Sequence, residues 1–180
     1  MVASRLKRQP QRQWVTLWIT ALAIISMVIA PAPALASIHI YHERAEQTTY
    51  RSRLTLPDRQ DQAWQATLFH RYVQGQDQGI YLRLVAFPGS AAVSPTEPLQ
   101  VSTGTGIEWL APANYALLPI PHPQNIGQYD FEEVLQTLSS PIPMTLAVPL
   151  AAGNRRELVV APYVVEEWRS LGAMGDPSHS

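Results

Sequence analysis

Two runs of alternating residues constrain the fold of this chain more than any other feature. In residues 64–73 every second position, counted from Trp64, belongs to one face of a strand. These positions carry a tryptophan, an alanine, a leucine, a histidine and a tyrosine. Residues 80–87 alternate in the same way, with Arg83 on the polar side. A period of two is typical of a strand with one buried face. Because the polar segment 74–79 between the runs contains two glycines, the pattern predicts a β-hairpin.

Shorter segments extend this pattern on both sides of the hairpin. Strands are predicted at residues 48–56, 99–103, 106–110, 144–150 and 157–160, because apolar or β-branched residues alternate there between turn residues. Residues 112–128 contain four prolines and little periodicity, and are predicted to form a long loop.

Two segments show a helical period instead. One is expected to begin at Asp130, which with Glu133 forms a capping box. The other is expected to run from Pro162 to Gly172, with an apolar stripe that includes Trp168. The predicted fold is therefore α+β, with a mostly antiparallel sheet of about six to seven strands and two packed helices.

The first 36 residues have the pattern of a secretory signal. Four basic residues precede an apolar run, residues 14–30, and Ala34 and Ala36 supply the small residues that signal peptidase requires. Cleavage is expected between Ala36 and Ser37, which gives a single β-rich domain at residues 37–171 and a flexible C-terminal tail at 172–180. The alternative is an uncleaved membrane anchor, since the run approaches the length that spans a bilayer. After cleavage no stable membrane insertion is expected.

Charge and cysteine content limit the partners and the compartment. Residues 37–180 keep nine of the 13 basic residues, all arginines, against 14 acidic ones, so their net charge is −5 with neutral histidines. This balance argues against nucleic acid as a partner. The chain has no cysteine, which fits a bacterial periplasm or a thylakoid lumen better than a eukaryotic secretory route.

Cleavage after Ala36 would create a candidate metal site at the new N-terminus. Ser37, Ile38 and His39 would offer a free amine, two amide nitrogens and an imidazole in third position. Four nitrogens in a plane suit Cu(II), which leads the order of divalent metal affinities. Possible copper binding is the only cofactor that the sequence suggests.

The proline-rich segment carries the candidate docking residues. Tyr115, Leu117, Leu118, Ile120 and His122 would present apolar and aromatic side chains on a stiff loop. A protein partner belonging to a membrane complex is therefore suspected, and the first hypothesis is a non-enzymatic exported interaction module, an accessory or assembly factor of a thylakoid or envelope complex.

No catalytic set is found, and the expectation is that the protein is not an enzyme. Gly89-Ser90-Ala91 lacks the second glycine of a nucleophile elbow. The alternative hypotheses are a small-ligand or copper-binding protein of the lumen or periplasm, with an apolar ligand held in a cavity lined by Trp64, Leu82, Trp109 and Trp168, and a hydrolase in which His70 converges with a carboxylate and a serine.

Several segments resemble a family of cyanobacterial exported proteins classed as a domain of unknown function. The similar segments are Ile38-His39, Trp64-Gln65-Ala66-Thr67-Leu68-Phe69, Leu82-Arg83-Leu84-Val85-Ala86-Phe87-Pro88-Gly89, Asn125-Ile126-Gly127-Gln128-Tyr129-Asp130 and Val165-Glu166-Glu167-Trp168. The resemblance spans most of residues 37–171 and implies a cyanobacterial source and a thylakoid-lumen or periplasmic location. It implies no activity and no site residues.

Overall fold

A computed structural model describes residues 39–44 and 46–175 of the chain. Within these residues there are nine strands and two helices. The strands are β1 (His39–Arg44), β2 (Gln47–Pro57), β3 (Ala63–Val73), β4 (Gln76–Ala86), β5 (Leu99–Thr103), β6 (Glu108–Ala111), β7 (Ile126–Asp130), β8 (Met144–Pro149) and β9 (Arg155–Val160). The helices are α2 (Glu132–Thr137) and α3 (Pro162–Gly172). No helix in the described part of the chain is both long and apolar enough to span a bilayer.

The strands form two antiparallel sheets, where the sequence predicted one sheet of six to seven strands. The larger sheet has the order β1-β2-β3-β4-β7 and the smaller one the order β6-β5-β8-β9. The α+β class and the antiparallel pairing are confirmed. The strand count was too low partly because β7 begins inside the segment predicted to be a loop and ends at the predicted helix cap, and a glycine and two polar side chains hide its alternation.

The hairpin of β3 and β4 is confirmed, with a tighter turn than the sequence suggested. The strands are joined by Gln74 and Gly75 alone, and both have positive φ, 52° and 74°. Two-residue turns of this kind match the twist of the strands that they join. The predicted inner face is also confirmed, since Trp64, Leu68, Leu82 and Leu84 are at most 1% exposed.

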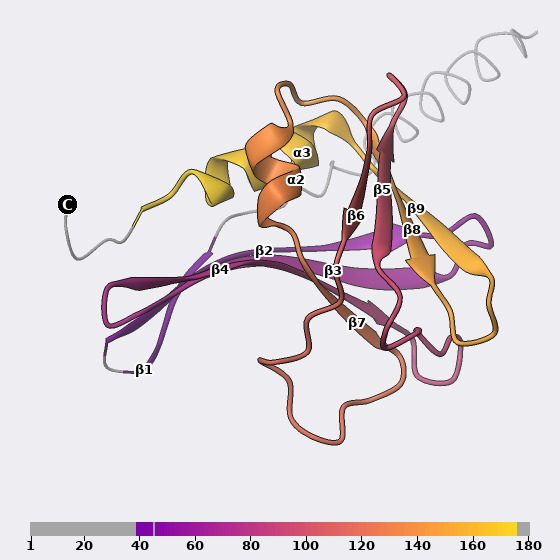
Figure 1. Ribbon diagram of the computed structural model, residues 1–180, viewed down its shortest axis with the longest axis horizontal. Coiled ribbons are helices and arrows are strands. Elements are labelled where there is room, and N and C mark those ends of the chain that lie inside the picture. Colours follow the sequence, from indigo (N-terminus) through magenta and orange to yellow (C-terminus); the bar gives the residue numbers. More distant parts are fainter. Residues whose placement is uncertain (1–38, 45, 176–180) are drawn as a thin grey trace, which may run out of the picture. The chain divides into compact units, whose positions relative to one another are not determined.

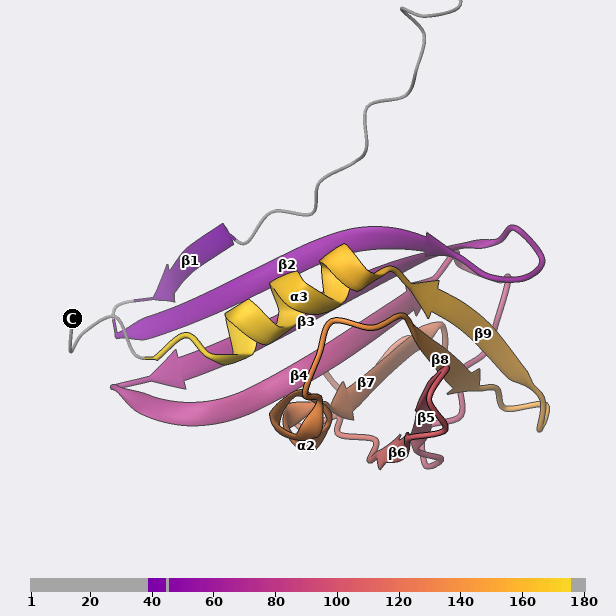
Figure 2. The same cartoon turned by 90° about the horizontal axis from the view of Figure 1, so that it is seen from above.

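Both helices cover the inner face of the larger sheet, as Figure 1 shows. Seen from above, α3 lies over β2 and β3 (Figure 2). Its buried residues are Val164, Val165, Trp168 and Leu171, which is the predicted stripe. Residues of both sheets and both helices join in one hydrophobic core.

The predicted capping box of the shorter helix is wrong. The cap residue of α2 is Phe131, whose side chain forms no capping hydrogen bond. Asp130 instead ends β7, where it pairs with Tyr81 of β4. Its Oδ1 accepts a hydrogen bond from the Glu132 amide at 3.2 Å. Pairing in the sheet therefore moves the cap position from the predicted Asp130 to Phe131.

Gly127 of β7 leaves space for a buried tyrosine. A Cβ atom at residue 127 would lie 2.6 Å from the hydroxyl oxygen of Tyr129, and Tyr129 is fully buried. We expect Gly127→Ala to lower the free energy of unfolding by about 1–3 kcal/mol, because the ring must move within a packed core. Urea unfolding followed by circular dichroism measures the change.

Gly104→Ala is the matched control, since a Cβ there meets no atom within 4 Å. This control is expected to change stability by less than about 0.5 kcal/mol. Equal effects of the two substitutions would contradict the steric account.

Candidate functional site

The outer face of the larger sheet is strongly basic. Arg51 and Arg53 project from β2 on the side opposite the core, Arg71 from β3 and Arg83 from β4. The register brings these strands together, since Arg53 lies opposite Thr67 and Thr67 lies opposite Arg83. Four of the nine arginines in residues 37–180 therefore gather on one surface of a chain that is acidic on average.

These arginines line a groove of about 390 Å³, here called the arginine groove. Its lining residues are Thr49, Arg51, Arg53, Gln65, Thr67, Phe69, Arg71, Arg83, Val85, Leu117 and Ile126. No aspartate or glutamate is among these lining residues. The groove combines positive charge with an apolar end formed by Val85, Leu117 and Ile126.

Neutral neighbours fix the orientation of two of the arginines. Arg83 donates from Nε and Nη2 to Gln128 Oε1, at 3.0 and 2.7 Å, and its guanidinium lies 5.2 Å from the centre of the Phe69 ring. Gln128 is fully buried and donates to the carbonyl of Asn114 at 2.8 Å. Arg71 donates from Nη2 to Gln47 Oε1 at 2.9 Å. Such contacts position a guanidinium without cancelling its charge.

Two polar atoms in the floor of the groove have no hydrogen-bond partner among the described residues. They are Thr49 Oγ1 and Arg71 Nε, and Thr49 is only 2% exposed. A buried polar group without a partner costs about 1–3 kcal/mol. Arg53, in contrast, is exposed and forms no hydrogen bond or ion pair with the described residues. The groove thus holds donors that an incoming acceptor would satisfy.

The predicted docking residues do not form a single patch. Leu117 lines the arginine groove, while Tyr115 and His122 stack at 4.5 Å beside a separate cavity of about 200 Å³. Leu118 is half-buried and Ile120 is 94% exposed. The loop lies on the side of the sheet away from the helices (Figure 1). It is tied to the fold by the Tyr115 hydroxyl, which donates to the carbonyl of Ile126 at 3.3 Å.

The proposed copper site stays a prediction. Ser37 and Ile38 lie outside the described residues, and His39 is the first residue of β1. Across residues 39–44 and 46–175, no group of three or more histidine, cysteine, aspartate or glutamate side chains is arranged to hold a metal.

The tryptophans proposed to line an apolar cavity lie in different environments. Trp64, Leu82 and Trp168 are packed in the core, whereas Trp109 borders an open pocket beside α2. The Trp64 indole N–H donates to Asp58 at 3.2 Å, and that of Trp168 to Ser52 at 3.3 Å. These residues therefore contribute packing and hydrogen bonds to the core.

His70 is buried on the inner face of β3, as expected for a histidine of the core. Its Nε2 lies 2.9 Å from Asp77 Oδ2. The described residues around the adjoining cavity include no serine, so the His–carboxylate–Ser arrangement of the hydrolase hypothesis is not formed there.

The sequence analysis missed the arginine groove, although a signal was present. Arg51 and Arg53 alternate with core residues of β2, and Arg83 occupies the equivalent place in β4. Each arginine looks like an ordinary solvent-facing residue by itself. Only the register of three strands shows that they share one surface.

Fold and site together define a β-rich domain of two antiparallel sheets and two helices, with a basic groove on the sheet face away from the helices. Residues 36–171 match the family model described as "Protein of unknown function (DUF3122)", and the chain belongs to this family. Comparisons with curated proteins and with solved structures gave no match.

Proposed function

We propose that this protein is a non-enzymatic exported binding module whose arginine groove receives an acidic segment of a partner protein. The partner would belong to a membrane complex of a cyanobacterial thylakoid or envelope, for which the module would act as an accessory or assembly factor. The single observation that carries the proposal is the arginine groove. Four guanidinium groups line a concave surface without a carboxylate among its lining residues.

The charge distribution of residues 37–180 favours a role of the arginine groove in binding a partner. Residues 37–180 carry a net charge of −5, so a basic groove concentrates the opposite charge in one place. Complementary potentials of this kind steer association and select the partner. An acidic side chain could also give Arg71 Nε the acceptor that it lacks.

The apolar end of the groove favours a peptide over a bare anion. Val85, Leu117 and Ile126 lie next to the arginines and offer a surface for an apolar side chain. An extended segment with carboxylates followed by a leucine or phenylalanine would match both ends. Such a mixed site gains specificity from the charges and affinity from the buried apolar area.

Two features support export. The basic and apolar segments of residues 1–36 have the pattern of a secretory signal. The family match begins at residue 36, next to the expected cleavage position. An exported module without cysteines suits a lumen or periplasm, where the partner complex would present its acidic segment.

Fluorescence polarisation with a labelled peptide of several glutamates ending in leucine tests the groove. We expect this peptide to bind, and we expect affinity to fall with added salt because exposed charges are screened. The double variant Arg53→Gln/Arg71→Gln should weaken binding by about tenfold or more, since a charge-assisted hydrogen bond is worth about 1.5–3 kcal/mol.

Arg59→Gln is the matched control, because Arg59 is exposed, lies outside the groove and contacts Glu157. It should leave the affinity for the peptide unchanged. Equal binding of the same peptide with glutamines in place of glutamates would overturn the proposal. Tighter binding of citrate, which would favour the small-ligand alternative, or of a single-stranded oligonucleotide would overturn it as well.

A further inference from the structure

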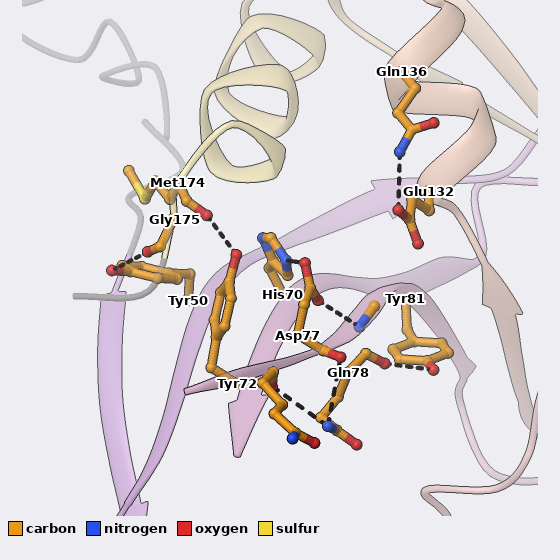
Figure 3. A network of polar contacts seen from close by, with 12 residues as sticks. Tyr50, His70, Tyr72, Asp77, Gln78, Tyr81, Glu132, Gln136, Met174 and Gly175 are labelled. Atoms are coloured by element: carbon orange, nitrogen blue, oxygen red, sulfur yellow. Dashed lines mark hydrogen bonds and ion pairs between the residues drawn. The ribbon is translucent and has the colours of Figure 1, made fainter. Parts of the chain in front are cut away.

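A second cavity lies on the opposite side of the larger sheet, near the end of α3. Its volume is about 450 Å³. It is lined by His70, Tyr72, Asp77, Ile80, Glu132, Leu135, Gln136, Leu138, Arg169, Gly172, Ala173, Met174 and Gly175. Figure 3 shows its polar side, where His70 and Asp77 face each other below the end of α3 and Glu132 projects from α2. We call it the His70 cavity.

The contact between His70 and Asp77 fixes where the imidazole proton lies. Burial would raise the pKa of Asp77, but hydrogen bonds from the Gly79 amide and from His70 outweigh burial, and the pKa is lowered. The carboxylate is therefore ionised at neutral pH and accepts the proton carried by Nε2, 2.9 Å away. In the neutral ring this leaves Nδ1 with a free lone pair.

His70 Nδ1 has no hydrogen-bond partner within residues 39–44 and 46–175, although His70 is only 3% exposed. In Figure 3 this nitrogen points toward the segment that follows α3. In that segment the amides of Ala173 and Met174 donate to the carbonyls of Arg169 and Leu171. The carbonyls of Met174 and Gly175 accept hydrogen bonds from the hydroxyls of Tyr72 and Tyr50, at 3.0 and 3.1 Å. A buried acceptor next to a cavity is thus left without a donor among the described residues.

A β-bulge builds the polar side of this cavity. The register pairs His70 with Ile80 but Tyr72 with Asp77, so β4 has an extra residue at this point. Gly79, with a φ of 92°, adopts the conformation that the bulge needs, and its amide donates to Asp77 Oδ1 at 2.7 Å. The bulge turns Asp77 to the inner face beside His70. Bulges often re-aim side chains at functional sites.

The charges around the cavity favour a cationic ligand. The titratable groups that line it are His70, Tyr72, Asp77, Glu132 and Arg169. Arg169 forms an ion pair with Glu166 at 2.9 Å, so its charge is compensated. In the part of the chain that the structure describes, the Glu132 carboxylate accepts a hydrogen bond from the neutral amide of Gln136, at 2.9 Å. The two carboxylates in the lining therefore leave it negative.

We propose that the His70 cavity binds a small amine with an apolar body. The ammonium group would donate to His70 Nδ1 and lie in the negative field of Asp77 and Glu132, while the apolar body would contact Leu135, Leu138 and Met174. This site is independent of the arginine groove, because the two lie on opposite faces of the larger sheet and favour ligands of opposite charge.

Isothermal titration of the purified full chain with three matched probes tests the ligand class. The probes are 2-phenylethylamine, 2-phenylethanol and 3-phenylpropionate, which share a ring and differ in their polar end. We expect the amine to bind about tenfold or more tightly than the carboxylate, because the site is negative. Equal affinities, or tighter binding of the carboxylate, would overturn the proposal.

Two further readouts separate the site from non-specific binding. The ring nitrogen resonances of His70 should shift on adding the amine, because the ammonium group would donate to Nδ1. Glu132→Gln should lower amine affinity severalfold. Glu133→Gln, an exposed neighbour outside the cavity lining, should not. Unchanged His70 resonances at saturating amine would overturn the assignment.

Discussion

Replacing Trp168 by alanine is expected to lower the free energy of unfolding by about 3–5 kcal/mol, the range for removal of a large aromatic side chain from a core. Trp168 is fully buried in α3 and meets Phe131 edge-on, with ring centres 5.8 Å apart. Its indole N–H donates to Ser52 of β2. One side chain thus joins α3 to β2 and to the residue that directly precedes α2.

A loss of this size is a large part of the total stability of a domain, which is about 5–15 kcal/mol. Guanidinium unfolding followed by circular dichroism measures the change without relying on tryptophan fluorescence. Trp168→Phe should cost less, about 1–2 kcal/mol, because it keeps the ring contact and loses the hydrogen bond to Ser52.

Tyr163→Ala is the matched control, since this aromatic side chain lies on the same helix and is 56% exposed. Its effect should stay within about 0.5 kcal/mol. A loss below about 1 kcal/mol for Trp168→Ala would contradict the view that this residue closes the core.

Asp58→Ala is expected to have an effect of similar size, about 3–5 kcal/mol, because it leaves one buried and two partly buried donors without their acceptor. Asp58 is 5% exposed and follows β2. Its Oδ1 accepts from the amides of Gln60 and Gln62, and its Oδ2 from the Trp64 indole. The residue also bridges to Leu158 of β9, so it ties the two sheets together.

The contribution of Asp58 should depend on pH. Burial by itself would raise the pKa of Asp58. The hydrogen bonds from the amides of Gln62 and Gln60 and from the Trp64 indole together outweigh burial, so the pKa lies below the ordinary value of 3.8. A lowered folded-state pKa means that the charged form stabilises the fold. The contribution is therefore complete above the unfolded pKa and is lost as the pH falls through the folded one.

Urea unfolding between about pH 7 and about pH 3 tests this sign. The difference between the wild type and Asp58→Ala should be constant near neutral pH and shrink at the acid end. Asp61→Asn, in the same turn but exposed, is the control and should change the stability at neutral pH by less than about 0.5 kcal/mol. A difference that grows with falling pH would contradict the assignment.

Local patterns in the sequence determined the elements whose residues lie close together along the chain. The hairpin of β3 and β4 follows from a period of two on both sides of a short turn, and α3 from its apolar stripe between Pro162 and Gly172. The burial of these faces also follows, because only one side of each element is apolar.

Only the tertiary structure decided the features that depend on distant pairing. β7 pairs with β4 across a long insertion, and this pairing turns Asp130 from a helix cap into a strand residue. Short segments such as β7 carry too weak a pattern to identify on their own, and their partner strand supplies the missing hydrogen bonds.

The two candidate sites depend on the structure for the same reason. Alternation alone placed Arg83 on the polar side of its strand, but the shared register of β2, β3 and β4 assembled the groove. The bulge at Gly79 then turned Asp77 toward His70, against the strict alternation of its strand. The sequence determined which face of each strand is polar, and the pairing of strands determined which polar residues meet.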